Sequence, residues 1–188
     1  MKRKLFTMIA VGLSATMIYA ATIFTGQLVF RPVDWEHQKT VGARVTRDLF
    51  GDLYDWTFTT GTNANQMQTL TVITATMTNG ATYSIDITDL TNSFGDAVSF
   101  NPVRLFGATA PAANSNALEI QSASLNGWTA PFGASTTNGA IVLRPGGAIF
   151  MTAPDLTGYA VATNSCCITL SNTGTNTVSA TIYIAGSE

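Results

Sequence analysis

A four-residue turn between two apolar runs constrains the fold of this chain more than any other feature. Residues 140–143 and 148–153 are short apolar runs, and Arg144-Pro145-Gly146-Gly147 separates them. Proline at the second position of a turn pre-sets φ, and glycine at the third position tolerates a positive φ. The pattern therefore predicts a β-hairpin. Short β-rich runs that end in Gly, Pro or Asn recur along most of the chain.

An Asn-Gly turn predicts a second hairpin. Thr78-Asn79-Gly80-Ala81 stands between the β-rich runs 68–76 and 82–88, and Asn-Gly in such a place favours a two-residue hairpin loop. Apolar residues alternate with polar ones over residues 177–185, which is typical of a half-buried strand. The remaining predicted strands are 27–33, 97–106, 117–123, 159–161 and 168–171.

The body of the chain is predicted to be a single all-β domain. No run after residue 56 has the period of an amphipathic helix, and many short strands with turn residues between them favour an antiparallel β-sandwich that is jelly-roll-like. A chain of 188 residues can bury one sizeable core. We therefore predict a β-sandwich domain over residues 57–188, preceded by an N-terminal hydrophobic segment and an extended arm.

Residues 1–21 have the layout of a secretory signal peptide. Lys2-Arg3-Lys4 precedes a mostly apolar run over 5–19, and Ala20-Ala21 follows it. A retained hydrophobic anchor is the alternative, because the uncharged run continues to Phe30 and a spanning helix needs roughly 20 apolar residues. Contact with a membrane is expected only through this segment, if it is retained.

Residues 22–56 are predicted to form an N-terminal strand followed by a charged and aromatic arm. We interpret 34–56 as a loop or arm with room for a short helix, because its pattern is poorly periodic. Mixed charges beside aromatic side chains suit a contact surface between subunits, and a solvated connector is the alternative. The candidate assembly contacts are Trp35, His37, Arg44, Arg47, Phe50, Tyr54 and Trp56.

The charge distribution argues against nucleic acid as a partner. Beyond residue 50 the basic side chains are Arg104 and Arg144, against eight acidic ones, so this part carries a net charge of −6. Binding to nucleic acid needs many cationic side chains to neutralise phosphates. A surface rich in Thr, Ser and Asn is instead common in extracellular or assembling proteins.

No catalytic set is recognisable, and we predict that the protein is not an enzyme and has no cofactor or metal site. His37 is the only histidine, which falls short of the usual zinc ligand sets, and no GxSxG, HExxH or P-loop pattern occurs. Asp86, Asp89 and Asp96 could contribute oxygen ligands to calcium, but their spacing matches no EF-hand loop. Turn capping by their carboxylates is the simpler interpretation.

The two cysteines are adjacent, Cys166 and Cys167. Neighbouring side chains on a strand face opposite ways, so we expect one cysteine in the core and the other nearer the surface. A disulfide between neighbours would need a strained turn. An intermolecular bridge is the alternative.

An ordered series of short motifs runs along the second part of the chain. The motifs are residues 89–96 (DLTNSFGD), 98–100 (VSF), 103–104 (VR), 114–120, 131–133 (PFG), 143–147 (LRPGG), 153–155 (APD), 157–161 (TGYAV) and 183–186 (YIAG). In order and approximate spacing, the chain from about Thr69 to its end resembles small β-rich structural proteins of tailed bacteriophages.

The resemblance implies a non-enzymatic virion component, such as a head-decoration protein. Its partners would be copies of itself and a major capsid or other virion protein, and its location the virion. Because residues 1–21 look like an export signal, an exported, extracellular location is the alternative, with the protein a subunit of a cell surface or an extracellular filament. A second alternative is a carbohydrate-binding β-sandwich that uses Trp128 and Tyr159 as stacking platforms.

Overall fold

A computed structural model describes residues 26–30, 36–41, 44–49, 54–92, 94–133 and 139–188, and up to residue 56 it describes the backbone alone. Every regular element in these ranges is a strand. Within the same ranges no helix is long and apolar enough to cross a bilayer. The predicted signal peptide or anchor, residues 1–21, lies outside the described residues.

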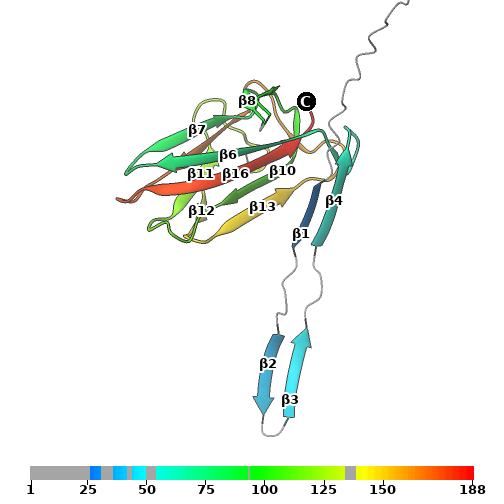
Figure 1. The fold of residues 1–188 in the computed structure, drawn as a ribbon, viewed down its shortest axis with the longest axis vertical. Helices are drawn as coiled ribbons and strands as arrows, with labels where there is room; N and C mark the ends of the chain where they lie inside the picture. Colours follow the sequence, from blue (N-terminus) through cyan, green and yellow to red (C-terminus); the bar gives the residue numbers. More distant parts are fainter. Residues whose placement is uncertain (1–25, 31–35, 42–43, 50–53, 93, 134–138) are drawn as a thin grey trace, which may run out of the picture.

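Two antiparallel sheets form the body of the protein (Figure 1). Their strands are β6 (Thr69–Met77), β7 (Thr82–Asp86), β10 (Pro102–Thr109), β11 (Leu118–Ser122), β12 (Ile141–Leu143), β13 (Ala148–Thr152), β14 (Tyr159–Ala160), β15 (Cys167–Ser171) and β16 (Val178–Gly186). One sheet has the order β13-β10-β16-β6, with β14 also paired to β10. The other has the order β12-β11-β15-β7.

The strand orders define a jelly roll. Among the eight strands that make the two sheet paths, the chain passes from one sheet to the other at every connection except that from β11 to β12. In each sheet, the strand that comes first in the chain is the neighbour of the strand that comes last. These pairs are β6 with β16 and β7 with β15. The predicted all-β, jelly-roll-like sandwich is confirmed.

Both predicted hairpins are wrong, although their turns are right. Gly146 has a φ of 78° and Gly80 a φ of 67°, and each turn is closed by a backbone hydrogen bond, from Gly147 N to Arg144 O at 2.7 Å and from Ala81 N to Thr78 O at 3.1 Å. However, β12 pairs with β11 while β13 pairs with β10. Likewise β6 and β7 belong to different sheets. The turn reverses the chain, but burial of apolar faces between the sheets decides which strand becomes the partner.

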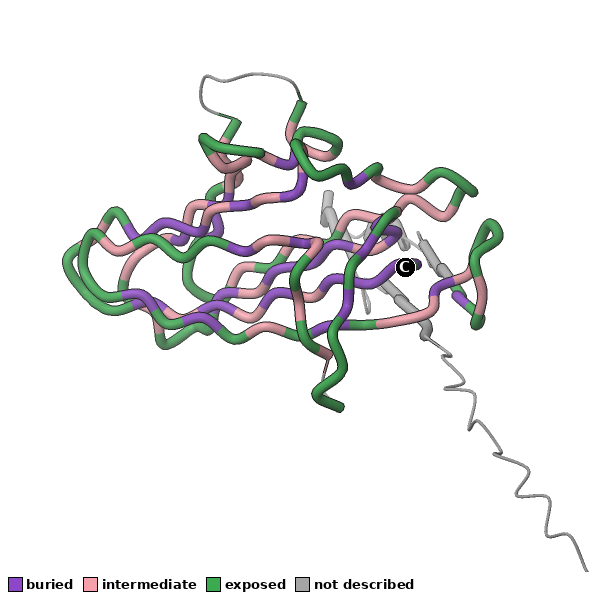
Figure 2. Tube along the Cα trace, turned by 90° about the horizontal axis from the view of Figure 1, so that it is seen from above, coloured by how far each residue is buried: buried purple, intermediate pink, exposed green. Residues whose placement is uncertain are grey.

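The core lies between the two sheets, as the buried segments in Figure 2 show. The alternation predicted for the last strand is confirmed, because Val178, Ala180, Ile182 and Ile184 are all fully buried. Phe106 of β10 packs edge-on against Trp128, with ring centroids 5.8 Å apart. Trp128 comes from the long connection between β11 and β12.

The arm precedes the sandwich and is built from strands, so the short helix that the sequence left room for is absent from the described part of residues 34–56. Strands β1 (Gly26–Phe30) and β4 (Tyr54–Thr60) pair antiparallel, and β5 (Gln66–Met67) adds to β4 in parallel. Strands β2 (Glu36–Val41) and β3 (Arg44–Leu49) pair with each other. We call β1 to β4 the ribbon, and Figure 1 shows it projecting from the sandwich.

The predicted strand over residues 97–106 is interrupted in the structure. Its first part is β9 (Ala97–Val98), which pairs with β8 (Leu90–Thr91), and its second part belongs to β10. Asn92 Oδ1 accepts hydrogen bonds from Phe94 N at 2.9 Å and from Asp96 N at 3.0 Å. This side-chain capping of the turn between β8 and β9 is the local chemistry expected of Asn and Asp.

Candidate functional site

The ribbon carries the assembly contacts that the sequence predicts, where they are described. His37 lies on β2, Arg44 and Arg47 on β3, and Tyr54 and Trp56 on β4. Trp35 and Phe50 lie outside the described residues. The described residues of this set therefore lie on strands β2, β3 and β4, which the sequence did not reveal.

The register of β1 and β4 aligns aromatic and aliphatic positions across the ribbon. Trp56 is opposite Leu28, and Tyr54 is opposite Phe30. Residues two apart on a strand share a face, and so do directly opposed partners. These four positions therefore share one face of the ribbon, and Phe58 continues the same face toward the sandwich. The outer part of the ribbon is different, because His37 is opposite Asp48 and Gln38 is opposite Arg47.

Phe58 shows where that apolar face meets the sandwich. Phe58 and Met67 are each 1% exposed and form a small core cluster with Ala185 of β16. Half-buried Leu105 of β10 packs against the same cluster. The contact lies on the outer face of the β13-β10-β16-β6 sheet, since Ala185 and Leu105 are cross-strand partners there.

A buried arginine ties the loop between β4 and β5 to the sandwich. Arg104 is 0% exposed. Its guanidinium donates to Thr62 O at 2.7 Å, Gln66 O at 2.8 Å and Leu156 O at 2.9 Å, and also to Asn63 O. Burial lowers the pKa of Arg104, while the charge of Asp155 acts in the opposite direction. The group remains a cation held by backbone carbonyls.

A β-bulge explains why a charged side chain leaves β10 in this direction. Val103 pairs with Gly186 and Leu105 pairs with Ala185, so Arg104 is the extra residue between them. Bulges redirect a side chain without ending the strand. A Cβ at Gly186 would lie 2.1 Å from Pro102 O, so only glycine allows the two strands to approach this closely. The sequence analysis did not identify Arg104 as a buried residue. The one sequence signal for this is the position of a cation within the mostly apolar strand β10.

The same outer sheet face continues from the Phe58 contact into an exposed apolar row. Val72, Tyr183, Gly107 and Phe150 are successive cross-strand partners on β6, β16, β10 and β13. Phe150 lies over Gly107, where an added Cβ would be 2.4 Å from the ring. Its ring centroid is 5.9 Å from that of Tyr183. Val72 is 48% exposed, Phe150 is 42% exposed and nearby Leu70 is 37% exposed.

We call Leu70, Val72, Phe150 and Tyr183 the apolar row. In the register, Leu70 pairs with Ala185, which already lies under Phe58. The apolar row is thus the continuation, on the same sheet face, of the surface that the base of the ribbon covers. Contiguous exposed apolar surface is a common mark of a protein–protein contact.

The proposed stacking platforms for carbohydrate do not exist in the form predicted. Trp128 is 0% exposed, and its indole N–H donates to Ala160 O at 2.8 Å. Tyr159 is half-buried and packs edge-on against it, with ring centroids 6.1 Å apart. Burial raises the pKa of Tyr159, and the charge of Asp155 adds to the effect. These rings are core packing.

The three aspartates that could have held calcium do not converge. Among the described residues, the one group of three or more metal-binding side chains is Asp86 with Cys166 and Cys167; Asp89 and Asp96 are not part of it. Asp86 Oδ1 instead caps its turn, accepting from Thr88 N at 2.9 Å and from Thr88 Oγ1 at 2.6 Å. The calcium hypothesis is therefore wrong, and turn capping is confirmed for Asp86.

The adjacent cysteines differ from the expectation in one respect. Cys166 is buried and Cys167 is half-buried, as predicted. Their side chains do not face opposite ways, however, because the two Sγ atoms are 3.3 Å apart. The backbone at this point is not a regular extended strand.

No protein-family model matches the chain, and comparisons with curated proteins and with solved structures give no match. The resemblance to phage structural proteins therefore stays a prediction from the sequence.

Proposed function

We propose that this protein is a non-enzymatic structural subunit that associates with copies of itself, with its place in a virus particle beside a capsid protein. The observation that carries the proposal is the projecting ribbon (Figure 1). A two-stranded ribbon is marginally stable by itself in water. A ribbon of this kind gains stability when its apolar face packs against another surface.

The contact surface in this proposal is the apolar row of a second copy. Within one chain, Phe58 of the ribbon already packs on the outer face of the β13-β10-β16-β6 sheet. The ribbon positions of Trp56 and Tyr54 continue the face of Phe58 away from the sandwich. The apolar row continues the sheet face beyond the same contact. The ribbon positions and the apolar row therefore carry residues of the same chemical kind as the contact around Phe58.

Charge is compatible with this arrangement. The apolar row contains no ionisable group except the Tyr183 hydroxyl, and the surrounding strand positions are mostly Thr and Ser, such as Thr74, Thr181 and Ser179. Burying an unpaired charge would cost several kcal/mol. A partner that covers this face would bury no such charge. Apolar centres with polar rims are the usual composition of subunit contacts.

The role of the ribbon is tested by matched substitutions on the full chain. We expect Trp56→Ser, on the ribbon, and Phe150→Ser, in the apolar row, each to weaken self-association at least tenfold. Phe94→Ser is the control, because Phe94 is 79% exposed but lies on the turn between β8 and β9. Size-exclusion chromatography with light scattering, over a range of concentrations, gives the association constants.

Mixing the two defective variants sharpens the test. A Phe150→Ser copy keeps an intact ribbon, and a Trp56→Ser copy keeps an intact apolar row, so the mixture should recover one good contact per pair. Failure of the mixture to associate, with each variant folded, contradicts ribbon-to-row packing. A wild-type chain that is monomeric at about 100 µM, or particles that form equally well without residues 22–56, would contradict self-assembly through the arm altogether.

The exported alternative is separated by intact mass and electron microscopy of native material. A mass that begins at Met1, in shells or virions, supports the viral role. A mass that begins near Thr22, in filaments or at a cell surface, supports an exported subunit that uses the same ribbon contact.

A further inference from the structure

We propose that Asp86, Cys166 and Cys167 form a binding site for one thiophilic divalent cation, with zinc as the biological candidate. One ligand atom from each of the three side chains lies within 4.8 Å of the other two. Two sulfur ligands favour zinc and related soft ions over calcium or magnesium, which prefer oxygen. The site lies in the sandwich, and the kind of cation that it binds does not depend on how the protein assembles.

The strand pairing brings the carboxylate to the thiols. Asp86 is the last residue of β7, and it is directly opposite Cys167, the first residue of β15. Ile87 N donates to Cys166 O at 2.9 Å, which holds the two strand ends together beyond the last paired residues. The cluster is therefore part of the sheet and does not depend on a long side chain reaching across a loop.

A local departure from strand geometry places both sulfurs on one side. Cys166 N and Cys167 N both donate to Asn126 O, each at 2.8 Å. In an extended strand, successive N–H groups point to opposite edges, so two of them on one acceptor require a turned backbone. This turn is the reason that the two Sγ atoms lie 3.3 Å apart.

The segment that supplies the shared acceptor is itself closely packed. Asn126 has a φ of 52°. A Cβ at Gly127 would lie 2.1 Å from Ala123 O, and Trp128 N donates to Cys167 O at 2.8 Å. The backbone around the cysteines is thus fixed from both sides. A fixed backbone reduces the ordering that a cation would otherwise have to impose.

The distances suit a tetrahedral ion after a small adjustment. Zinc–sulfur bonds of about 2.3 Å imply a sulfur–sulfur distance of roughly 3.8 Å, so the two thiols need to separate by about half an ångström. Thr88 holds Asp86 Oδ1, which orients the carboxylate as hydrogen-bonded neighbours orient metal ligands. Three protein ligands leave a fourth position for water or another small donor.

A bound cation takes two thiolates and one carboxylate, so each binding event releases two thiol protons to solvent.

The test uses cadmium as the probe, because cadmium–thiolate bonds absorb in the ultraviolet, and zinc as the competitor. With reduced full-length protein we expect one cadmium ion per chain, a thiolate absorption band and displacement by zinc. Cys167→Ser should abolish the band, and Asp86→Asn should weaken binding at least tenfold. Asp89→Asn is the matched control and should bind as the wild type does.

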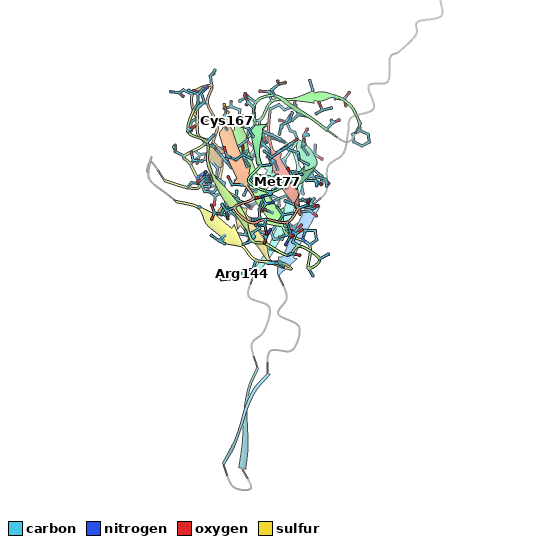
Figure 3. The ribbon with its side chains drawn as sticks, turned by 90° about the vertical axis from the view of Figure 1, so that its left-hand side faces the viewer. Met77, Arg144 and Cys167 are labelled. Atoms are coloured by element: carbon cyan, nitrogen blue, oxygen red, sulfur yellow. The ribbon has the colours of Figure 1, made fainter. Side chains whose placement is uncertain are left out.

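Asp86→Asn keeps an oxygen that can accept from Thr88, so it tests the ligand without removing the turn cap. Each variant is compared with the wild type by its thermal unfolding temperature without metal. No cadmium or zinc binding at 100 µM, or unchanged affinity in Asp86→Asn, would overturn the proposal. If both free thiols disappear in air and the mass of the single chain falls by two hydrogens only, the cysteines form an intramolecular disulfide. That outcome would also overturn the metal site. Asp86 and Cys167 belong to the β12-β11-β15-β7 sheet, whereas the apolar row lies on the β13-β10-β16-β6 sheet, so metal binding should leave self-association unchanged. Figure 3 shows Cys167 and Arg144 toward opposite ends of the body in that view.

Discussion

The sandwich and the ribbon are built from the same kind of antiparallel strand, but they bury their apolar residues in different ways. In the sandwich, β16 lies between β10 and β6, and its apolar residues face the opposite sheet. In the ribbon, β2 and β3 have only each other as strand partners among the described residues. Two sheets bury each other's apolar faces. A single two-stranded ribbon can bury an apolar face only against another surface.

The boundary between these two regions is a mixed contact. It combines a small apolar cluster around Phe58 with the carbonyl cage of Arg104. From β6 onward the strands bury their apolar residues against each other, whereas the described N-terminal part contacts the sandwich through Phe58, Met67 and the carbonyls that Arg104 holds. Three predictions, taken from the largest expected effect to the smallest, test this division.

The largest effect is expected in the core of the sandwich. Phe106 is 0% exposed and packs against Trp128, so Phe106→Ala should lower the free energy of unfolding by about 3–5 kcal/mol. Urea denaturation followed by tryptophan fluorescence measures the change. Phe94→Ala should stay within about 0.5 kcal/mol, since Phe94 is exposed. Equal effects of the two substitutions would mean that the sandwich core does not carry the stability.

An intermediate effect is expected at the boundary. Arg104→Met leaves the carbonyls of Thr62, Gln66 and Leu156 without their buried donor. Removing an unfavourable buried charge offsets part of that loss, and we expect a net destabilisation of about 2–4 kcal/mol. Hydrogen exchange should increase first in residues 61–67, before β10 and β16.

The control for this boundary is the other arginine of the sandwich. Arg144 is exposed on the turn between β12 and β13, and Arg144→Met should change the free energy of unfolding by less than about 0.5 kcal/mol. Uniformly faster exchange throughout Arg104→Met would contradict a local role at the boundary, because it would place the arginine in the global fold.

The smallest effect near neutral pH concerns Cys166. The folded protein holds the Cys166 proton more tightly than the unfolded chain does, because burial raises the pKa of this thiol to about 12. This contribution to stability is fully present below the unfolded thiol pKa of about 8.5 and is lost as the pH rises through the folded value. Denaturation with EDTA should therefore show falling stability above about pH 8.5, and Cys166→Ala should reduce that slope. If stability falls equally steeply with pH in Cys166→Ala, the Cys166 thiol is not the cause of the pH dependence.

Local chemistry made the turns and strands predictable. Gly80 and Gly146 adopt the positive φ that their turns require, and the alternation of residues 177–185 gives the buried face of β16. The all-β class and the jelly-roll-like sandwich followed from the number of such strands. The ribbon residues were recognised as an arm by composition, but their strand pairing was not, because mixed charges and aromatics have no clear period.

The sequence did not predict which distant strands pair with each other. The same turn residues serve a hairpin and a connection between sheets, so the partners of β12 and β13 depended on which apolar faces could be buried together. Arg104 looked like any strand cation until the bulge at its position turned it toward the loop after β4. Asp86 looked like a neighbour of Asp89 and Asp96, but strand pairing places it opposite Cys167.

The sequence by itself thus determined where the chain turns, which residues are extended and which class of fold results, since these depend on φ preferences and on alternation within a few residues. The tertiary structure alone decided which strands became neighbours, which cation was buried and which side chains from distant strands met. Those outcomes depend on burying apolar surface between segments far apart in the chain, as where Phe58 and Ala185 share a buried cluster, and no local pattern encodes that choice.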